Sequence, residues 1–458
     1  MCFNQFDILE RHLIDIMKDM KIPGLTLGVV REGEPVYIKG FGARNLTCNL
    51  PMTPDTLFGI GSITKSFTSV AIHQLVEQGK LNLEDPVKNY IDFKLGSEEN
   101  PITIHHLLSH TTGIPTLDGA GVLVNRYLGK ALDTRPLNLL PMSSWQDFML
   151  FINGADTEII SEPGKVFFYN NDFYTCLGLV IEKITEMPFD KYIKDKILTP
   201  LEMNRTTFLK EDFEKDENRA TGYHPSKMQN RVFEEVFPLF SKFIYPAGGL
   251  LSTVREMLNY MQVFMTQGTF KGKQLITPSS INRMMTPVIN MYAHGFAIER
   301  DFFNHTLIQH DGATSGTSAY LAFIPDLKTG IVLGTNGGDA PLSDIGRGIL
   351  SVLLGEDLKK VVLLPFLATQ QKINQITGKY ETYKGVYSGE VKFENGFFYL
   401  EGPGSSGVLK LPLVVKDLER LEFHIPKVFP GSIDVKFHID EESGQVHFIS
   451  DRYYFHRI

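Results

Sequence analysis

Hydrophobic and polar positions follow two different periods along this chain. Residues 1–24 carry apolar side chains at helical spacing, and residues 25–45 have the pattern of two strands joined by a turn at the letters REGE. A second helical pattern covers residues 62–79, and a helix-rich region follows from about 100 to 200. Strand patterns return between residues 294 and 336, and a last amphipathic helix is predicted directly after them.

These patterns predict two domains of different class. Strands near both ends of residues 1–360, with helices between them, indicate a mixed α/β (α+β) domain whose single sheet combines N- and C-terminal segments. The composition changes near residue 365, where residues 361–377 form a polar linker with a short helix. Short alternating segments over residues 378–458 predict a small, separate β-barrel (lipocalin-like) or sandwich domain.

Composition narrows the classes of function. The formal net charge is −8 without a long basic run, which argues against nucleic acid as the main partner. The three cysteines, Cys2, Cys48 and Cys176, include no C-x-x-C pair, and this sparse, odd set indicates a reducing compartment. No segment approaches the roughly twenty apolar residues of a membrane span, and the N-terminal helix lacks the apolar run of a secretory signal. We therefore expect a cytoplasmic protein that binds no membrane.

Ser62 and Lys65 form a Ser-x-x-Lys pattern in the stretch GIGSITKSF. A serine hydroxyl is a poor nucleophile without a neighbouring base, and positions i and i+3 of a helix lie on one face. The first turn of a helix also stabilises a developing alkoxide and disfavours an ammonium, which lowers the pKa of a lysine there. Taken alone the pattern is short, and a solvated pair of helix residues is the alternative interpretation.

Further segments accompany this pattern in a fixed order. They are ITIHHLLSHTTGIP, EPGKVFFYNNDFYTCLGLVIEKITEMPFDKYI and YPAGGLLSTVREMLNYM. With SITK they resemble the serine β-lactamase and penicillin-binding protein family over roughly residues 5–355. The resemblance is greatest to its class C-like branch, which includes D-aminopeptidases, D,D-peptidases and esterases. It implies a β-lactamase/transpeptidase-like antiparallel sheet flanked by helices, with a helical subdomain.

The resemblance implies a role for several residues. Ser62 is expected to be the catalytic nucleophile and Lys65 its base. Tyr169, the first residue of the Tyr-x-Asn motif, would exchange protons with Ser62 and the leaving group. Asn171, the last residue of that motif, would bind the amide of the substrate.

The third motif of the family is usually Lys-Thr-Gly, whereas this chain has His310, Asp311 and Gly312 in its place. Some D,D-peptidases, D-aminopeptidases and esterases of the family carry a similar His-x-Gly. By resemblance, the N–H groups of Ser62 and Ala313 form an oxyanion hole, in which one donor typically contributes about 2.7–4 kcal/mol. We expect His310 to be catalytic, and Asp311, Gly312 and Ala313 to bind substrate. A carboxylate at Asp311 should repel a substrate carboxylate and tolerate an ammonium.

Two further histidines, His106 and His110, lie four positions apart on a predicted helix. This spacing could suit a metal ion, but no H-E-x-x-H motif accompanies it, so a packing or capping role is favoured. We expect neither a metal nor a cofactor.

These observations predict a serine hydrolase that works through an acyl-enzyme, with a peptidase or amidase on short or D-residue-containing peptides as the leading interpretation. An esterase or a β-lactamase of the same fold is the alternative, although the missing lysine of the third motif and the expected location disfavour the β-lactamase. A second alternative is a non-catalytic protein that senses ligands or serves as a scaffold. The expected partners are a small-molecule or short-peptide substrate and further copies of the chain, because a domain of about eighty residues buries only about 60% of its unfolded surface.

Overall fold

The structure is a computed structural model that describes residues 5–119, 122, 142–226, 231–234, 240–289, 291–338, 340–356, 372–394, 396–404, 407–426, 432–440, 443–450 and 453–458. The chain divides into two compact units, Met1–Gly355 and Glu356–Ile458, and each has a hydrophobic core of its own. Of the predicted linker, residues 361–371 lie outside the described residues.

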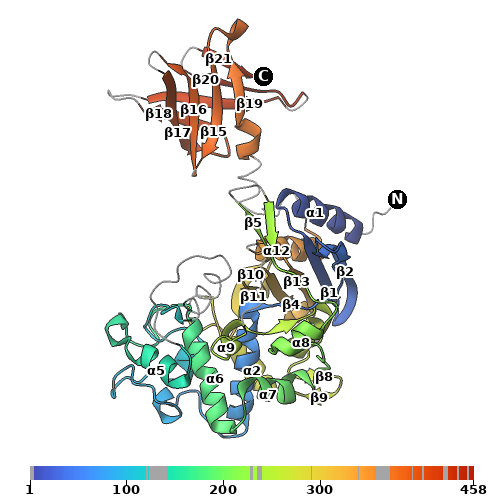
Figure 1. Ribbon diagram of the computed structural model, residues 1–458, viewed down its shortest axis with the longest axis vertical. Helices are drawn as coiled ribbons and strands as arrows, with labels where there is room; N and C mark the ends of the chain where they lie inside the picture. The colour runs from blue at the N-terminus through green and yellow to red at the C-terminus, as the bar shows by residue number, and fades with distance from the viewer. Residues whose placement is uncertain are drawn as a thin grey trace. The chain divides into compact units, whose positions relative to one another are not determined.

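A seven-stranded antiparallel sheet forms the centre of the first unit (Figure 1). Its strand order is β10-β11-β12-β13-β1-β2-β3. The strands are β1 (Gly24–Arg31), β2 (Glu34–Asn45), β3 (Leu50–Pro51), β10 (Ala297–Phe302), β11 (His305–Ala313), β12 (Ser318–Ile324) and β13 (Thr329–Thr335). Because β1 pairs with β13, the two ends of this unit meet in the middle of the sheet, as the sequence predicts.

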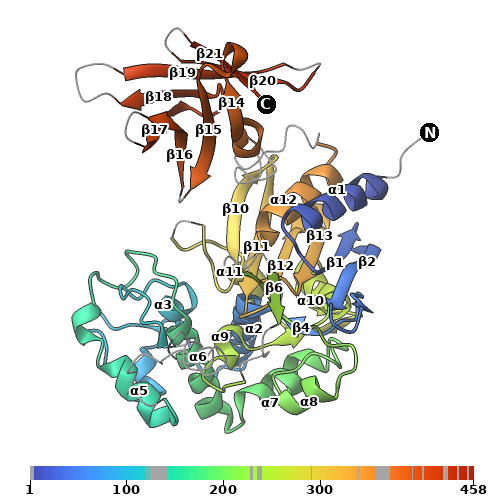
Figure 2. The same cartoon turned by 45° about the horizontal axis from the view of Figure 1, so that its top comes forward.

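Helices cover both faces of this sheet (Figure 2). Helices α1 (Gln5–Asp19) and α12 (Leu342–Leu353) pack on one face, and α2 (Thr64–Glu77) and α10 (Val254–Met265) lie on the other. Strands β12 and β13 are consequently buried along their whole length. The predicted fold class, a mixed α/β unit with an antiparallel sheet between helices, is confirmed.

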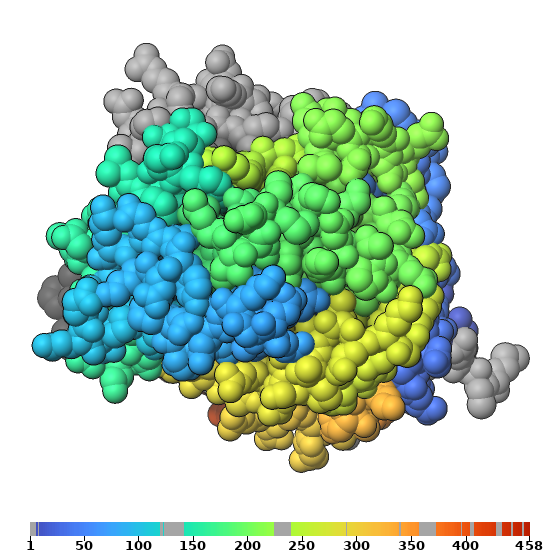
Figure 3. Space-filling view, turned by 90° about the horizontal axis from the view of Figure 1, so that it is seen from below, coloured from blue at the N-terminus to red at the C-terminus, as the bar shows by residue number. Residues whose placement is uncertain are grey.

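The helix-rich middle of the chain lies beyond α2. Its helices are α3 (Ile104–Leu108), α5 (Trp145–Asn153), α6 (Asn171–Thr185), α7 (Phe189–Ile193), α8 (Lys210–Lys215), α9 (Tyr245–Gly248) and α11 (Pro278–Met284). Figure 3 shows one face of the molecule on which light-blue, green and yellow segments, far apart in the sequence, adjoin. Within the described ranges, no helix is long and apolar enough to cross a membrane.

Three small strand pairs complete the first unit. They are β4 (Phe58–Gly59) with β7 (Leu251–Ser252), β5 (Tyr223–Ser226) with β6 (Arg231–Glu234), and β8 (Thr269–Phe270) with β9 (Lys273–Gln274). Of these strands, β4 leads directly to Ser62.

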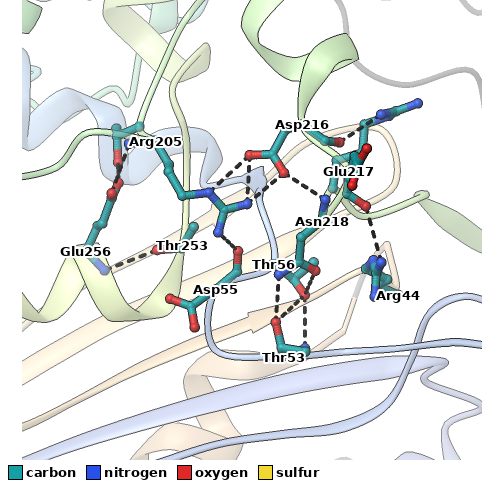
Figure 4. A network of polar contacts seen from close by, with 12 residues as sticks. Arg44, Thr53, Asp55, Thr56, Arg205, Asp216, Glu217, Asn218, Thr253 and Glu256 are labelled. Atoms are coloured by element: carbon teal, nitrogen blue, oxygen red, sulfur yellow. Dashed lines mark hydrogen bonds and ion pairs between the residues drawn. The ribbon is translucent and has the colours of Figure 1, made fainter.

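A polar network holds the segment that enters β4 (Figure 4). The Arg205 guanidinium donates to both carboxylate oxygens of Asp216 and to the Asp55 carbonyl oxygen. Asn218 bonds to Thr53 at 2.9 Å and to Thr56 at 3.0 Å through its side chain. These contacts join residues that are distant in sequence, and they fix the path of the chain just before the Ser62 turn.

The second unit is a closed antiparallel barrel, in which the described residues form eight strands (Figure 1). The strands are β14 (Gly378–Glu381), β15 (Ser388–Glu394), β16 (Phe397–Gly404), β17 (Gly407–Asp417), β18 (Glu422–Pro426), β19 (Ser432–Ile439), β20 (Val446–Ser450) and β21 (Tyr453–Arg457). Alternate side chains point inward and fill its core. The barrel predicted from the alternating pattern is confirmed.

Candidate active site

Ser62 lies in a short 3₁₀ turn, Gly61–Ile63, directly before helix α2. The sequence predicts one helix from residue 62 onward, so the structure differs by placing the serine in a tighter turn. Gly61 has φ of 52°, in the left-handed region that glycine adopts without a steric penalty. This conformation turns the chain sharply from β4 into the helix and places Ser62 at the bend.

The end of β11 touches this turn through its backbone. A Cβ atom on Gly312 would lie 2.0 Å from the Ile60 carbonyl oxygen and 2.9 Å from the Ser62 nitrogen. A Cβ atom on Gly61 would lie 2.4 Å from the Ala313 nitrogen. Only glycine therefore permits this approach, and it brings the backbone nitrogens of Ser62 and Ala313 to one junction. Two N–H donors in one place are what an oxyanion hole requires.

The Lys65 ammonium nitrogen is the centre of the polar contacts beside Ser62. Nζ lies 3.0 Å from Ser62 Oγ, 2.7 Å from Asn171 Oδ1 and 2.6 Å from the Ala247 carbonyl oxygen. The two latter oxygens can only accept hydrogen bonds. A neutral lysine has two N–H groups, which these acceptors occupy, so its lone pair is left for the Ser62 hydroxyl. This arrangement suits proton removal from Ser62.

Burial lowers the pKa of Lys65 well below its ordinary value, because the ammonium loses its hydration. The carboxylates of Asp311 and Asp172 raise this pKa, but their effect is smaller than that of burial. The side chain is completely buried. The fold thus favours the neutral amine that a general base must be.

Tyr169 and Asn171 reach the site from the start of α6. The Asn170 side chain caps this helix by accepting from the N–H groups of Asp172 and Phe173, and Tyr169 directly precedes the cap. The Tyr169 hydroxyl is buried and has no hydrogen bond of standard geometry in the described structure. Burial raises its pKa, whereas the neighbouring Ser62 side chain acts to lower it. The hydroxyl is therefore protonated and lies beside the Ser62 side chain.

His310 is brought close to these residues, but its ring nitrogens are engaged elsewhere. Nδ1 lies 2.5 Å from the Asp311 carbonyl oxygen, which can only accept, so Nδ1 carries the proton. Nε2 lies 2.9 Å from the Tyr292 hydroxyl. Burial lowers the pKa of His310 to about 4, so the ring is neutral and Nε2 accepts from Tyr292. In this structure His310 consequently presents no free nitrogen to Ser62, and its catalytic role stays a prediction.

Asp311 is exposed on β11, next to Gly312 and Ala313. Its carboxylate raises the pKa of both Lys65 and Tyr169, so it lies within electrostatic reach of the site. The same carboxylate also raises the pKa of His310, although burial lowers it more. Asp311 therefore places a negative charge near Ser62.

Three residues of the site were not predicted in these places. The Ala247 carbonyl oxygen binds Lys65, Tyr292 binds His310, and the His110 ring packs at a tilt against Tyr169 with ring centroids 4.4 Å apart. A carbonyl group leaves no trace in a sequence, and Tyr292 belongs to no motif. His110 does lie in a segment that resembles the family, ITIHHLLSHTTGIP. That location was the only feature of the sequence that could have placed His110 near the site.

The remaining histidines near this region do not form a metal centre. His106 completes a capping box with Thr103, which is the capping role predicted for it. His73, His294 and His105 form a chain of hydrogen bonds of 3.1 and 3.0 Å. Across the described ranges, no group of three or more His, Cys, Asp or Glu side chains has a geometry that could hold a metal ion.

Two family models match the chain. One, described as beta-lactamase, covers residues 9–354, and the other, described as the Pab87 octamerisation domain, covers residues 361–456. Among solved structures, the octameric penicillin-binding protein homologue from Pyrococcus abyssi is 33% identical with a TM-score of 0.85, over 99% of this chain and 100% of that one. A penicillin binding protein from Bacillus halodurans, 24% identical with a TM-score of 0.59 over 75% of this chain and 98% of that one, shares the fold.

Curated relatives match the first unit. Protein flp of Staphylococcus aureus (strain MW2) is 29% identical over 339 residues, or 72% of this chain. The chain spans 62% of the length of that relative. The putative penicillin-binding protein PbpX of Bacillus subtilis (strain 168) is 27% identical over 349 residues, which are 75% of this chain and 78% of the relative.

Proposed function

The chain belongs to the beta-lactamase family, whose members are generally serine hydrolases, and from this premise we propose that it hydrolyses amide bonds of short peptides through an acyl-enzyme on Ser62. The observation that carries the proposal is the set of contacts around Lys65. Two acceptors, Asn171 Oδ1 and the Ala247 carbonyl oxygen, occupy the N–H groups of a neutral lysine and leave its lone pair for Ser62 Oγ. The roles proposed for the other residues build on that geometry.

Acylation proceeds by proton transfer and attack. Lys65 takes the hydroxyl proton as Ser62 Oγ bonds to the carbonyl carbon of the substrate, and the carbonyl oxygen becomes an oxyanion. The N–H groups of Ser62 and Ala313 stabilise this charge. Collapse of the intermediate breaks the C–N bond, and the leaving amine takes a proton that Tyr169 passes on from Lys65.

Deacylation reverses these roles with water as the nucleophile. Water attacks the ester carbon of the acyl-enzyme and loses a proton to the Lys65 and Tyr169 pair. Ser62 Oγ leaves and regains its proton, so the enzyme returns to its starting state. Asn171 uses its Oδ1 on Lys65 and keeps its amide N–H groups for a carbonyl of the substrate.

The charge around Ser62 supports substrates that carry an amine. Asp311 is an exposed carboxylate beside Gly312 and Ala313, and its effect on the pKa of Lys65 indicates its closeness. A negative group attracts an ammonium and repels a terminal carboxylate. We therefore place aminopeptidase or amidase activity, including activity on D-residues, ahead of carboxypeptidase activity.

A panel of D- and L-aminoacyl amides, N-blocked peptides with free carboxylates, short-chain esters and β-lactams tests this proposal on the full-length protein. We expect the highest kcat/KM on the aminoacyl amides. Hydrolysis of esters alone would favour an esterase, hydrolysis of the lactams alone would favour a β-lactamase, and no turnover of any class would contradict the proposal.

Replacing Asp311 with threonine should change this selectivity. We expect kcat/KM on carboxylate-bearing peptides to rise by about tenfold relative to amine-bearing ones, the effect of about 1.4 kcal/mol of lost repulsion. Parallel kinetics on both substrate classes give the ratio. Asp301→Asn, which removes an exposed carboxylate of the neighbouring strand β10, is the matched control and should leave the ratio unchanged. An unchanged ratio in Asp311→Thr would show that this carboxylate does not face the substrate.

The barrel supports assembly of several copies of the chain. Residues 361–456 match an octamerisation domain, and the Pyrococcus abyssi homologue, similar over 99% of this chain, is octameric. The barrel also exposes apolar side chains that a monomer would leave in water, among them Phe397 at 65% and Val408 at 78% exposure. We infer a homo-oligomer held by the barrel.

Removal of the barrel should separate assembly from chemistry. A chain ending near residue 365 retains the whole core of the first unit and every residue proposed for the site. We expect it to form the acyl-enzyme and to hydrolyse small esters within about tenfold of the full-length rate, while size-exclusion chromatography with light scattering shows a monomer. If the shortened protein is folded but inactive on small esters, the barrel contributes to the active site and this division of roles is wrong.

A further inference from the structure

His110 has an unusual backbone for a large, buried side chain. It follows α3, it has no solvent exposure, and its φ is 60°, in the left-handed region. This conformation is uncommon for residues other than glycine, although histidine is enriched among those that adopt it, and it persists where the surrounding structure holds it. The surrounding structure must therefore hold His110 in place.

Its contacts enclose the proposed proton carrier Tyr169. The N–H group of Phe168 donates to the His110 carbonyl oxygen at 2.8 Å, and the N–H group of Asn170 donates to His110 Nδ1 at 3.0 Å. These are the two residues on either side of Tyr169. The His110 ring also packs against the Tyr169 ring at 4.4 Å between centroids. Backbone and ring of Tyr169 are thus both fixed by one residue.

The contact with Asn170 defines the state of the His110 ring. A backbone N–H group can only donate, so Nδ1 must be unprotonated and the neutral ring carries its proton on Nε2. Nε2 is buried without a hydrogen-bond partner in the described structure. The ring is enclosed by Phe167, Tyr174 and Tyr292, besides Tyr169. A protonated ring would lose the Asn170 contact and place a charge among aromatic side chains.

We propose that His110 is a positioning residue, which in its neutral form holds Tyr169 in register with Ser62 and Lys65. This inference rests on the proposed function, because it assigns His110 a role through Tyr169. The charged and titratable groups around it are Lys65 on α2, Tyr169 and Tyr174 at α6, Tyr292, and His310 on β11.

Burial among these groups favours the neutral form. It lowers the pKa of His110 well below its ordinary value, because the charged ring would lose its hydration. The Nδ1 lone pair of the neutral ring accepts from the Asn170 N–H group, so it does not take a proton from the substrate, and His110 does not act as a general base. The alternative role is packing alone, in which any side chain of similar volume would serve.

Two substitutions separate positioning from packing. His110→Phe keeps an aromatic ring but removes the acceptor for the Asn170 N–H group. His110→Asn keeps a side-chain acceptor one bond beyond Cγ, and asparagine tolerates positive φ. We expect kcat of the phenylalanine variant to fall by about 10²-fold with little change in KM, since a misplacement of about 1 Å has this effect. The asparagine variant should recover at least about tenfold of that loss.

A double-mutant cycle with Tyr169→Phe provides the decisive measurement on the full-length protein. If His110 acts through Tyr169, His110→Phe should reduce kcat by less than about threefold in the Tyr169→Phe background. Losses that multiply in the double variant, or a folded asparagine variant no better than the phenylalanine variant, would overturn the inference. Should His110→Phe not fold, as judged by thermal unfolding, the cycle is run with His110→Asn. If His110→Asn still lowers kcat, this loss must disappear in the Tyr169→Phe background. A loss of kcat that persists there would contradict the inference.

The same variants distinguish failure of the proposed function from failure of the role of His110. Each variant is also treated with a fluorophosphonate, and the rate of covalent labelling is followed by intact mass. A wild-type protein that is not labelled overturns the proposed function and this inference together. A labelled wild-type protein with independent effects of the two substitutions overturns only the role of His110.

Discussion

Replacing Ser62 with alanine will abolish turnover, with kcat lower by about 10⁶-fold on every substrate that the wild-type protein hydrolyses. In the proposed mechanism Ser62 Oγ forms the covalent intermediate, so alanine removes the atom on which the reaction depends. Steady-state kinetics with the best substrate of the panel measure the loss.

The fold should survive this substitution. Ser62 is only half-buried, and the substitution removes one small polar group, which contacts Lys65 Nζ and lies beside the Tyr169 hydroxyl. We expect the thermal midpoint to change by a few degrees at most and the substrate to bind with nearly unchanged affinity. A folded Ser62→Ala protein that retains more than about a thousandth of wild-type kcat would assign the nucleophile elsewhere.

Replacing Lys65 with arginine should be nearly as damaging as replacing it with alanine. Arginine keeps a positive charge but does not deprotonate at any working pH, so it cannot take the Ser62 proton. We expect kcat to fall by about 10²–10⁴-fold, the usual contribution of a general base. The rate of covalent labelling at Ser62 should fall in parallel.

Lys65→Met is the matched control for charge and shape. Methionine resembles the lysine stem in length but has no amine, so it should be as inactive as arginine while it fits the buried site more easily. Thermal unfolding shows which variants are folded. If arginine retained substantial activity and methionine did not, Lys65 would act by its charge, and the neutral-base mechanism would be wrong.

Much of the fold could be predicted because it is local. Strand and helix patterns have different periods, so the sheet segments at 25–45 and 294–336 and the barrel strands after residue 378 were recognisable without their partners. Strong alternation in the barrel reflects its closed wall, where one side of each strand is buried. Strand patterns at both ends of the first unit, with helical patterns between them, also indicated that these strands share one sheet.

The immediate surroundings of Ser62 were less predictable because they depend on distant segments. The backbone of β11 lies in close contact with the 3₁₀ turn at Gly61. The spacing of apolar residues in α2 does not report that contact. The Ala247 carbonyl oxygen is a backbone atom that every residue possesses. Sequence patterns report side-chain types, whereas these contacts are made by backbone.

The two histidines nearest to Tyr169 illustrate the same limit. His310 was expected to be catalytic from its place in the third motif, but its nitrogens are engaged by the Asp311 carbonyl oxygen and Tyr292. His110 was expected to pack or cap, and it does accept a backbone N–H group, but of Asn170 in another segment. In both cases the partner decides what the ring can do, and the partner is set by the fold.

Intact-mass analysis after exposure to a fluorophosphonate tests the central claim most directly, because the reagent requires an activated serine and no knowledge of the substrate. The wild-type protein should gain one adduct per chain, mapped to Ser62 by peptide analysis, and Ser62→Ala should gain none. A folded wild-type protein that gains no adduct, or that carries it on another residue, would contradict the assignment of Ser62 as the nucleophile.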